Sequence, residues 1–228
     1  MNEGTGLEAC LIPAPEDGVW RLGKAKEPLK YNKISPEDDR RSGGNRWSLV
    51  SYGTLYCASE LDGCFAEALA PFRVEPGLRA IIGDDWQEPY YMTPGNLPQD
   101  WRTRHTLVRL QPAKEARFLD VDDEQNLRML SLELKQQLAE LGVDGLTAEH
   151  IQGPNRRVTR QIAAWAIAQR TAEQGRLIHG IAYRSRFGMR QCWAIFSDVD
   201  LEEVESQPIW PETDGLRSVA EEYGLTIR

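Results

Sequence analysis

The amino-acid sequence predicts an α+β protein. Strand-like and helix-like segments are mixed along its 228 residues without the regular β-α alternation of a doubly wound parallel sheet. Two stretches, residues 124–141 and 156–171, carry apolar side chains three or four positions apart, which is typical of amphipathic helices. The length suits one domain with a sizeable core, so we expect a single domain over residues 1–228.

The first half of the chain can be assigned in order. Residues 1–16 are predicted as a loose lead-in and residues 18–22 as a strand. A long polar loop is expected over residues 24–45, followed by a strand over residues 53–58. Ser59, with Asp62 three positions later, is predicted to cap a helix that runs to about Leu69. Pro71 then ends this helix.

The second half begins with a segment rich in aromatic residues, at about residues 83–104. Its Trp86, Tyr90, Tyr91 and Trp101 stand among prolines and acids, and we interpret it as an ordered insertion that forms a lid or a partner surface. The other strands are expected over residues 106–111, 117–121, 179–183 and 191–196. The helices are expected over residues 124–141, 156–171 and 214–223, the first two ended by Gly142 and Gly175.

Composition and charge narrow the class of protein. The net charge of −8 is unlike that of proteins that hold nucleic acid by their global field. No apolar run approaches the ~20 residues that cross a bilayer, and the N-terminus lacks the pattern of a secretory signal. The four cysteines have no C-x-x-C spacing. We expect a cytoplasmic protein with reduced thiols, no membrane contact and no direct contact with nucleic acid.

The most informative stretch is residues 46–67. It begins with Arg46, passes through a strand that contains Tyr56 and ends on Glu67 in a short helix. An average glutamate is a solvated surface group, but the neighbours of Glu67 are apolar and its helix follows a core strand. A carboxylate at the rim of a core can stabilise the oxocarbenium-like state through which glycosidic bonds break.

The other candidate residues each have a structural and a functional interpretation. Tyr56 is either a core ring or a flat face for an aromatic base. Arg46, and Arg21 on the first strand, make either surface ion pairs or bidentate contacts to phosphate. Ser185 ends a strand without the G-x-S-x-G pattern of a nucleophile, so its functional role would be a hydrogen bond to a ligand hydroxyl.

Arginines also gather in three places along the chain. The clusters are Arg40, Arg41 and Arg46; Arg156, Arg157 and Arg160; and Arg184, Arg186 and Arg190. Most of these side chains are expected on the surface, but three such cations can also line one pocket for a diphosphate. The scattered histidines, His105, His150 and His179, have no metal-binding spacing, so no metal site is expected.

Taken in order, these motifs resemble the RES domain family, which is named for an arginine, a glutamate and a serine. The resemblance runs through Gly18-Val-Trp-Arg-Leu22, Arg46-Trp47, Tyr52-Gly-Thr-Leu-Tyr-Cys-Ala58, Phe65-Ala-Glu67, Gly180-Ile-Ala-Tyr-Arg-Ser185 and Cys192-Trp-Ala-Ile-Phe196. Tyr56 follows Arg46 by ten positions and precedes Glu67 by eleven, which is similar to the family's spacing. The resemblance implies an ADP-ribosyltransferase-like fold, in which helices flank a mixed, mainly antiparallel sheet.

The resemblance also implies a function and partners. Known members use NAD as a substrate and act as toxins of bacterial toxin–antitoxin pairs. Some degrade NAD by hydrolysis or phosphorolysis, and others ADP-ribosylate a protein. Their antitoxin usually carries a DNA-binding helix-turn-helix and covers the active site. NAD as substrate and a helix-turn-helix antitoxin are therefore the expected partners, with no separate cofactor, and a homo-oligomer is left open.

Residue by residue, the resemblance assigns a catalytic and NAD-binding set. Glu67 would hold the ribose and stabilise the developing cation. Arg46 would contact the phosphate or ribose of NAD, helped by Arg21, and Tyr56 would pack against the nicotinamide end. Ser185 would hydrogen-bond the ligand. Arg46, Tyr56 and Ser185 thus belong to both the catalytic and the binding set.

Three functions stay open at this point. We expect first an NAD glycohydrolase or phosphorylase. The second is a protein ADP-ribosyltransferase, for which Glu60 is the only nearby second acidic residue. The third is a non-enzymatic module that binds a nucleotide or a partner protein. The long segments 24–45 and 83–104 and the arginine-rich context of Ser185 depart from the simplest family pattern, which leaves toxicity and the ADP-ribose acceptor open.

Overall fold

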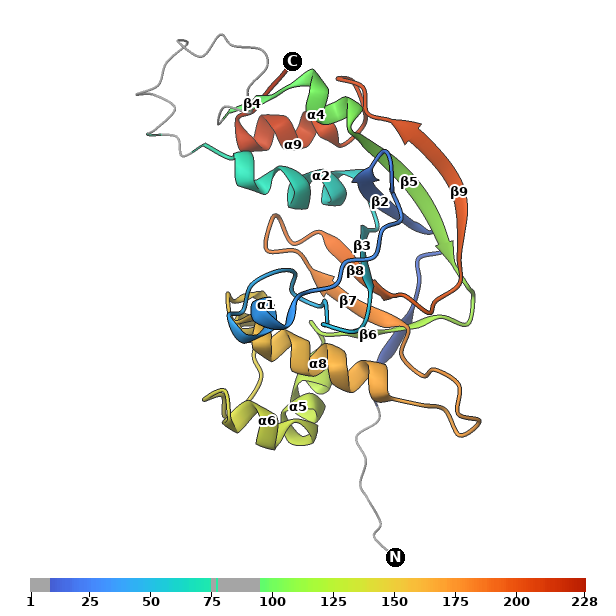
Figure 1. The fold of residues 1–228 in the computed structure, drawn as a ribbon, viewed down its shortest axis with the longest axis vertical. Coiled ribbons are helices and arrows are strands. Elements are labelled where there is room, and N and C mark those ends of the chain that lie inside the picture. Colours follow the sequence, from blue (N-terminus) through green and yellow to red (C-terminus); the bar gives the residue numbers. More distant parts are fainter. Residues whose placement is uncertain (1–8, 75–76, 78–94) are drawn as a thin grey trace, which may run out of the picture.

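A computed structural model describes residues 9–74, 77 and 95–228 of the chain. Its centre is a curled sheet of eight strands in the order β1-β6-β7-β8-β3-β2-β5-β9 (Figure 1). Neighbouring strands are antiparallel except β6 and β7, which are parallel. The strands are β1 (Leu11–Pro13), β2 (Val19–Lys24), β3 (Thr54–Ala58), β5 (His105–Pro112), β6 (Arg117–Asp120), β7 (Gly180–Arg184), β8 (Gln191–Phe196) and β9 (Leu201–Pro208). The predicted α+β class, with a mixed and mainly antiparallel sheet, is confirmed.

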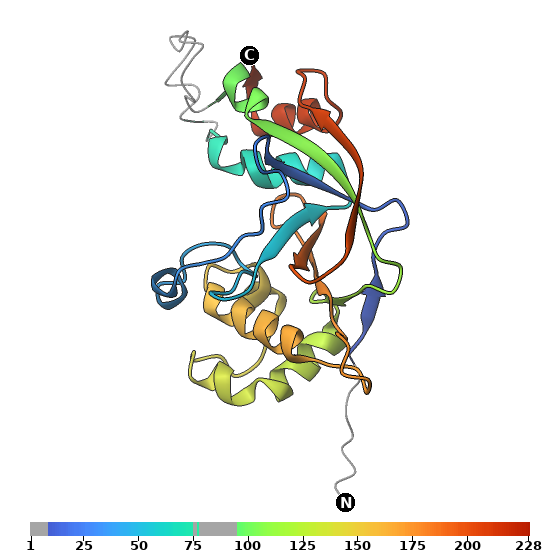
Figure 2. The same cartoon turned by 45° about the vertical axis from the view of Figure 1, so that its right-hand side comes forward.

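Helices lie on both sides of this sheet. In both views α2 packs with α9 at one end of the molecule, and α8 lies with α5 and α6 at the other (Figures 1 and 2). The helices are α1 (Pro36–Arg40), α2 (Leu61–Leu69), α4 (Gln99–Thr103), α5 (Glu124–Glu133), α6 (Lys135–Ala139), α7 (Ala148–Gln152), α8 (Arg156–Ala168) and α9 (Leu216–Tyr223), with a 3₁₀ turn η1 (Ala70–Phe72). The short strands β4 (Asn96–Leu97) and β10 (Thr226–Ile227) pair in parallel.

The central strands are buried on both faces because helices cover both. In β8, the five residues from Cys192 to Phe196 are all buried, although their side chains alternate between the faces. In β9, at the edge of the sheet, the residues from Glu202 to Ser206 are all exposed. Their acidic side chains are typical of an edge strand that is protected against pairing with another chain.

Most of the predicted elements form, with shifts of a few residues. The strands expected over residues 18–22, 53–58, 106–111, 117–121, 179–183 and 191–196 appear as β2, β3, β5, β6, β7 and β8. The terminal helix appears as α9, and the helix expected to follow residue 156 appears as α8, which ends at Ala168. The long loop 24–45 contains one short helix, α1, that the sequence analysis did not predict.

The helix predicted over residues 124–141 is divided into α5 and α6 at Leu134. Its apolar stripe still faces inward, because Leu127, Leu130, Leu134 and Leu138 are all buried. Next to the break, the Ser131 hydroxyl donates to the carbonyl of Leu127 and accepts the N–H of Leu146. This contact comes from a later part of the chain, and helical periodicity gives no sign of it.

Two further predictions need correction. Ser59 does not cap α2, because Glu60 is the N-cap residue and makes no side-chain capping bond. The Ser59 hydroxyl instead accepts the indole N–H of Trp193 at 2.9 Å. The lead-in is also not entirely loose, since β1 pairs antiparallel with β6 from Leu11 to Pro13. Residues 1–8 of the lead-in lie outside the described residues.

The insertion predicted at residues 83–104 is described only from residue 95. Trp86, Tyr90 and Tyr91 lie outside the described residues. Within the described part, Trp101 is buried and its ring stacks on His105 at 4.4 Å between centroids. In the described part of the chain, no helix combines the length and apolar character needed to cross a membrane.

Candidate active site

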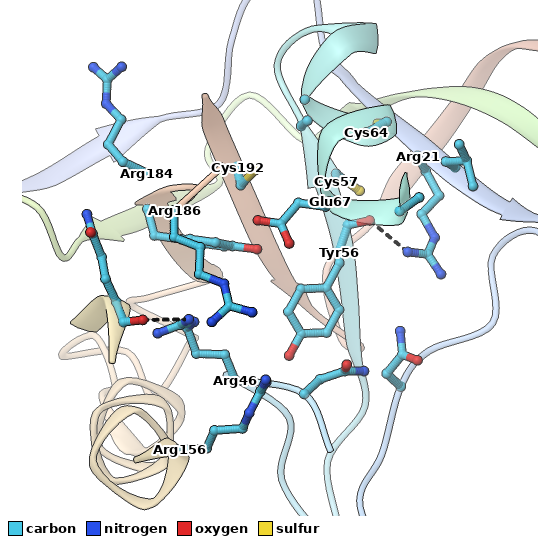
Figure 3. Close-up of a pocket in the computed structure, with 18 residues that line it drawn as sticks. Arg21, Arg46, Tyr56, Cys57, Cys64, Glu67, Arg156, Arg184, Arg186 and Cys192 are labelled. Carbon is cyan, nitrogen blue, oxygen red and sulfur yellow. Dashed lines mark hydrogen bonds between the residues drawn. The ribbon is translucent and has the colours of Figure 1, made fainter. Parts of the chain in front are cut away.

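A cavity of about 330 Å³ lies against the central strands of the sheet, with α2 on one side and the ends of α7 and α8 on the other (Figure 3). Its described lining comes from β2, β3, α2, β7 and β8 and from the ends of α7 and α8. Three loops also contribute, at Asn32, around Asn45 and at Arg186. The volume is at the lower end of the range for small-molecule sites, roughly 300–1,000 Å³. Segments far apart in the sequence therefore contribute to one site.

Glu67 reaches this cavity from α2. The helix approaches β3 closely because Gly63 has no side chain: a Cβ there would lie 2.7 Å from the Cβ of Ala58. One turn later the Glu67 carboxylate points toward the same space as the guanidinium groups of Arg46 and Arg186 (Figure 3). The side chain is exposed to solvent on the cavity side, while Ala66 next to it is fully buried.

Ser185 follows β7 and contacts Glu67 directly. Its hydroxyl donates a hydrogen bond to Oε1 of Glu67 at 2.6 Å and accepts the N–H of Phe187 at 3.0 Å. The serine is only 1% exposed. The expectation was that Ser185 would hydrogen-bond the ligand. In the structure its one proton is already donated to Glu67, and the serine is absent from the described lining of the cavity.

Tyr56 forms part of the cavity wall from β3. Its hydroxyl accepts the N–H of Trp47 at 2.9 Å and shares a 2.9 Å hydrogen bond with the Ser48 hydroxyl. Burial raises the pKa of Tyr56 to about 12, against the effect of these two hydrogen bonds. The phenol therefore stays protonated at neutral pH, and it fixes the backbone immediately after Arg46.

Arg46 is half-buried and lies at the end of α7. Its guanidinium donates to the carbonyls of Ile151, Gln152 (3.1 Å) and Gly153 (3.3 Å), where the negative end of the helix dipole favours a cation. Burial is the main cause that lowers the pKa of Arg46, and the positive charges of Arg156 and Arg186 lower it further. Arginine remains charged despite such a shift.

Arg21 lies on the other side of Tyr56 (Figure 3). It donates to the carbonyl of Tyr56 at 2.9 Å and to that of Pro28 at 3.4 Å. Both acceptors are main-chain oxygens, so Arg21 ties β2 to β3 and to the loop that follows β2. It also belongs to the cavity lining, with its positive charge uncompensated by a carboxylate among the described residues.

Arg156 and Arg186 line the cavity as well, although neither was named as a site residue from the sequence. Within the described residues, the guanidinium groups of both arginines make no hydrogen bond or ion pair, and that of Arg186 lies 4.8 Å above the Phe187 ring. Both extend into the cavity on the side of Arg46 (Figure 3). The feature of the sequence that pointed to these two residues was the presence of three arginine clusters. Each cluster supplies the cavity lining with one or more arginines.

Three other members of the clusters have different roles. Arg160 is buried and bonds to the loop before Arg46. Arg190 forms ion pairs with Asp62 and Glu222. Arg184 lines the edge of the cavity but extends away from it and donates to the Met189 carbonyl (Figure 3). Sequence position alone did not separate these roles.

Tyr183 and three cysteines complete the interior side of the cavity. Tyr183 is buried against Trp47, with ring centroids 5.6 Å apart, and burial raises its pKa well above the ordinary value. Cys57, Cys64 and Cys192 are buried free thiols, and burial raises the pKa of all three, to about 12 for Cys64. Protonated, enclosed thiols of this kind are structural and not nucleophilic.

Positive side chains outnumber negative ones in the described lining of the cavity. The described lining holds the arginines at positions 21, 46, 156, 184 and 186, and Glu67 is its only carboxylate. Yet the whole protein carries a net charge of −8. Among the described residues no group of His, Cys, Asp and Glu could hold a metal ion. The site is thus a local cationic pocket with one carboxylate, which suits an anionic ligand.

Comparisons with known proteins agree with this architecture. The model of the RES domain family matches residues 19–214. The fold is similar to a chain in the crystal structure of the M. tuberculosis MbcT–MbcA toxin–antitoxin complex. The TM-score is 0.50 at 14% sequence identity, over 96% of this chain and 93% of that chain. At this identity the likeness concerns the fold alone. A comparison with curated proteins finds no match.

Proposed function

The chain belongs to the RES domain family, and on this premise we propose that it is an enzyme that cleaves the nicotinamide–ribose bond of NAD. One observation carries the proposal. The Glu67 carboxylate, held by Ser185, faces a cavity in which the other charged groups of the described lining are arginines. A dinucleotide with an anionic pyrophosphate and a cationic nicotinamide ribose matches this distribution of charge.

The arginines account for binding. Arg156 and Arg186 have guanidinium groups without hydrogen-bonding partners among the described residues, and they lie beside the anchored Arg46. Three cations that repel one another in the free protein gain from a bound anion. Planar guanidinium groups bind phosphate oxygens with two parallel hydrogen bonds, so this group is assigned to the pyrophosphate. Tyr56 and Tyr183 would provide aromatic walls for the nicotinamide end.

Glu67 accounts for the chemistry. When the bond between the ribose C1′ and the nicotinamide nitrogen breaks, the electron pair stays on nicotinamide, which leaves as a neutral molecule. Positive charge then develops on the ribose, where a nearby carboxylate stabilises it. A leaving group of this kind needs no proton donor, in keeping with a described lining that contains no histidine and no carboxylate besides Glu67.

The lining also bears on the acceptor of the ADP-ribose. A protein acceptor is usually activated by a second acidic residue, and Glu67 is the only carboxylate in the described lining. Glu60, the one candidate from the sequence, is the exposed N-cap residue of α2 and is absent from that lining. This favours water or phosphate over a protein side chain. A glycohydrolase or phosphorylase is thus our first assignment, and a protein ADP-ribosyltransferase is the alternative.

We further assign the protein to a toxin–antitoxin pair. Family membership supports this assignment, and so does the similar fold in the MbcT–MbcA toxin–antitoxin complex. Glu67 and Arg186 are exposed at the cavity, so a partner protein placed over it would block access to both. The expected partner is an antitoxin with a helix-turn-helix domain.

The test is the release of nicotinamide from NAD by the purified protein. Wild type is compared with Glu67→Gln and with Glu60→Gln, a matched carboxylate change on the same helix but outside the cavity lining. Product analysis with and without added phosphate separates ADP-ribose from its phosphorylated form. Labelled NAD with a cell lysate reveals transfer to protein.

Release that is lost only in Glu67→Gln supports the proposal. Release that depends on a protein acceptor favours the transferase instead. A folded wild-type protein that binds NAD without releasing nicotinamide under any of these conditions would leave the non-enzymatic binding module as the better description.

A further inference from the structure

The loop between β7 and β8 carries two residues of the site, Ser185 and Arg186. Its ends are joined by hydrogen bonds from the Ser185 N–H to the Arg190 carbonyl (2.8 Å) and from the Met189 N–H to the Ser185 carbonyl (3.0 Å). Gly188 adopts a φ of +79°, which disfavours other residues. These bonds shape the loop but do not fix it to the rest of the protein.

The loop is attached to the rest of the protein by the Ser185–Glu67 hydrogen bond, by a contact of 3.7 Å from the Gln152 amide to the Met189 sulfur, and by the side chain of Arg190. The Arg190 side chain is folded back over its own loop, where Nη1 donates to the Phe187 carbonyl at 2.8 Å. Nε donates to Oδ2 of Asp62 at 2.8 Å, and Nη2 donates to Oε2 of Glu222 at 2.7 Å. Only 16% of the Arg190 side chain is exposed. A Cβ at Gly188 would lie 2.2 Å from Nη1, so the position leaves space for the guanidinium and no more.

The loop meets helix α2 at two points. Asp62 lies in the first turn of α2, and Glu67 lies on the same helix five residues later. The helix therefore touches the β7–β8 loop twice, through Asp62 with Arg190 and through Glu67 with Ser185. The third contact, with Glu222, joins the loop to α9, which holds no residue of the described cavity lining.

We propose that Arg190 is a positioning residue: by tying the β7–β8 loop to Asp62, it keeps Ser185 in line with Glu67. The inference rests on the proposed function, because it assigns Arg190 a role in the same reaction without contact to the substrate. Its effect on rate comes from geometry, since an error of about 1 Å in the position of a catalytic group can slow a reaction by about a hundredfold.

A purely structural ion pair would have different consequences. It would contribute to the stability of the fold and leave the turnover of folded molecules unchanged. The two carboxylate partners separate these roles, because only Asp62 lies on the helix that carries Glu67. Glu222→Gln removes one charge from Arg190 but leaves its bond to Asp62, which makes it the matched control for Asp62→Asn.

The experiment measures kcat and KM for NAD in Arg190→Gln, Asp62→Asn, Glu222→Gln and Arg190→Lys. Arg190→Gln and Asp62→Asn are expected to lower kcat by about tenfold to a hundredfold with little change in KM. Glu222→Gln is expected to lower the melting temperature and leave kcat close to that of wild type. Arg190→Lys, which retains a cation for Asp62, should recover part of kcat. Equal kcat in wild type and in a folded Asp62→Asn variant would overturn the proposal.

Amide hydrogen exchange followed by NMR gives a readout without turnover. The amides of Ser185 and Met189 should exchange faster in Arg190→Gln and Asp62→Asn than in wild type or Glu222→Gln. If wild type fails to cleave NAD, the proposed function fails, while faster exchange in these variants still supports the attachment of the loop by Arg190. Unchanged exchange overturns that attachment. Asp62→Asn provides the test on its own if Arg190→Gln does not fold.

Discussion

The hydroxyl of Ser185 donates a 2.6 Å hydrogen bond to Oε1 of Glu67, a residue 118 positions away in the sequence. Oε2 of the same carboxylate receives no hydrogen bond from the described residues, and the carboxylate as a whole faces the cationic cavity (Figure 3). One oxygen is therefore held by the protein while the other is free to interact with a ribose. A charge-assisted bond of this kind orients the carboxylate more firmly than an ordinary hydrogen bond.

Removal of this bond should reduce turnover more than binding. In Ser185→Ala, Glu67 keeps its charge but loses its fixed orientation, and the Phe187 N–H loses its acceptor. We expect kcat to fall by about tenfold to a hundredfold, with KM for NAD little changed. Steady-state kinetics check this, with Ser218→Ala, an exposed serine on α9, as the control. A rise in KM at unchanged kcat would instead favour direct contact between Ser185 and the ligand.

Arg156 and Arg186, whose guanidinium groups make no hydrogen bond or ion pair with the described residues, should govern binding. Arg156→Gln and Arg186→Gln are each expected to raise KM for NAD by about tenfold to a hundredfold, because each removes one charge-assisted contact worth roughly 1.5–3 kcal/mol. The double variant should also weaken the dependence of KM on ionic strength. Arg157→Gln is the control, since Arg157 is the exposed neighbour of Arg156 and is absent from the described cavity lining. Equal KM in all variants would place the pyrophosphate elsewhere.

Arg160 should matter for stability and for the loop that leads to Arg46. Its buried guanidinium donates to the Oδ1 of Asp39 and to main-chain carbonyls of Asp38, Asp39, Gly43 and Asn45. Arg160→Met keeps much of the volume and removes every donor. We expect the free energy of unfolding to fall by at least about 1–3 kcal/mol, the cost of leaving a buried polar group unpaired.

Urea denaturation measures this loss, and KM for NAD should rise in the same variant as the loop loosens. Arg157→Met is the control, since it changes an exposed arginine of the same helix. A stability equal to that of wild type would show that water replaces the buried donors without cost.

The raised pKa of the Tyr56 phenol predicts that the protein loses stability at alkaline pH. Burial raises its pKa from 10.0 to about 12, so between these values the unfolded chain releases the phenol proton while the folded protein retains it. The contribution of the protonated Tyr56 to the free energy of unfolding is complete below pH 10. It is lost as pH rises toward 12, at up to about 1.4 kcal/mol per pH unit. Denaturation curves across this range should be less pH-dependent in Tyr56→Phe. The same dependence in both proteins would contradict the buried phenol.

Part of the fold followed from local sequence patterns. The strand-like run over residues 53–58 and the alternation in residues 106–111 predict strands, because burial on a pleated sheet selects side chains by their spacing. The edge strand β9 escaped prediction, since a strand exposed along most of its length carries no apolar pattern. The break at Leu134 escaped it too, because it coincides with contacts made by Ser131 to a segment that follows much later.

The candidate site shows the same division. The sequence by itself identified Glu67 as a carboxylate at the rim of a core and placed the chain in its family, through short motifs whose residues are neighbours along the chain. The sequence could not show that Ser185 would donate to Glu67. Nor could it show that, among the described residues, Arg156 and Arg186 would make no hydrogen bond or ion pair while Arg160 and Arg190 would make several. Those outcomes depend on which segments the curled sheet brings together, because hydrogen bonds and charges act over a few ångströms in space, whatever the separation along the chain.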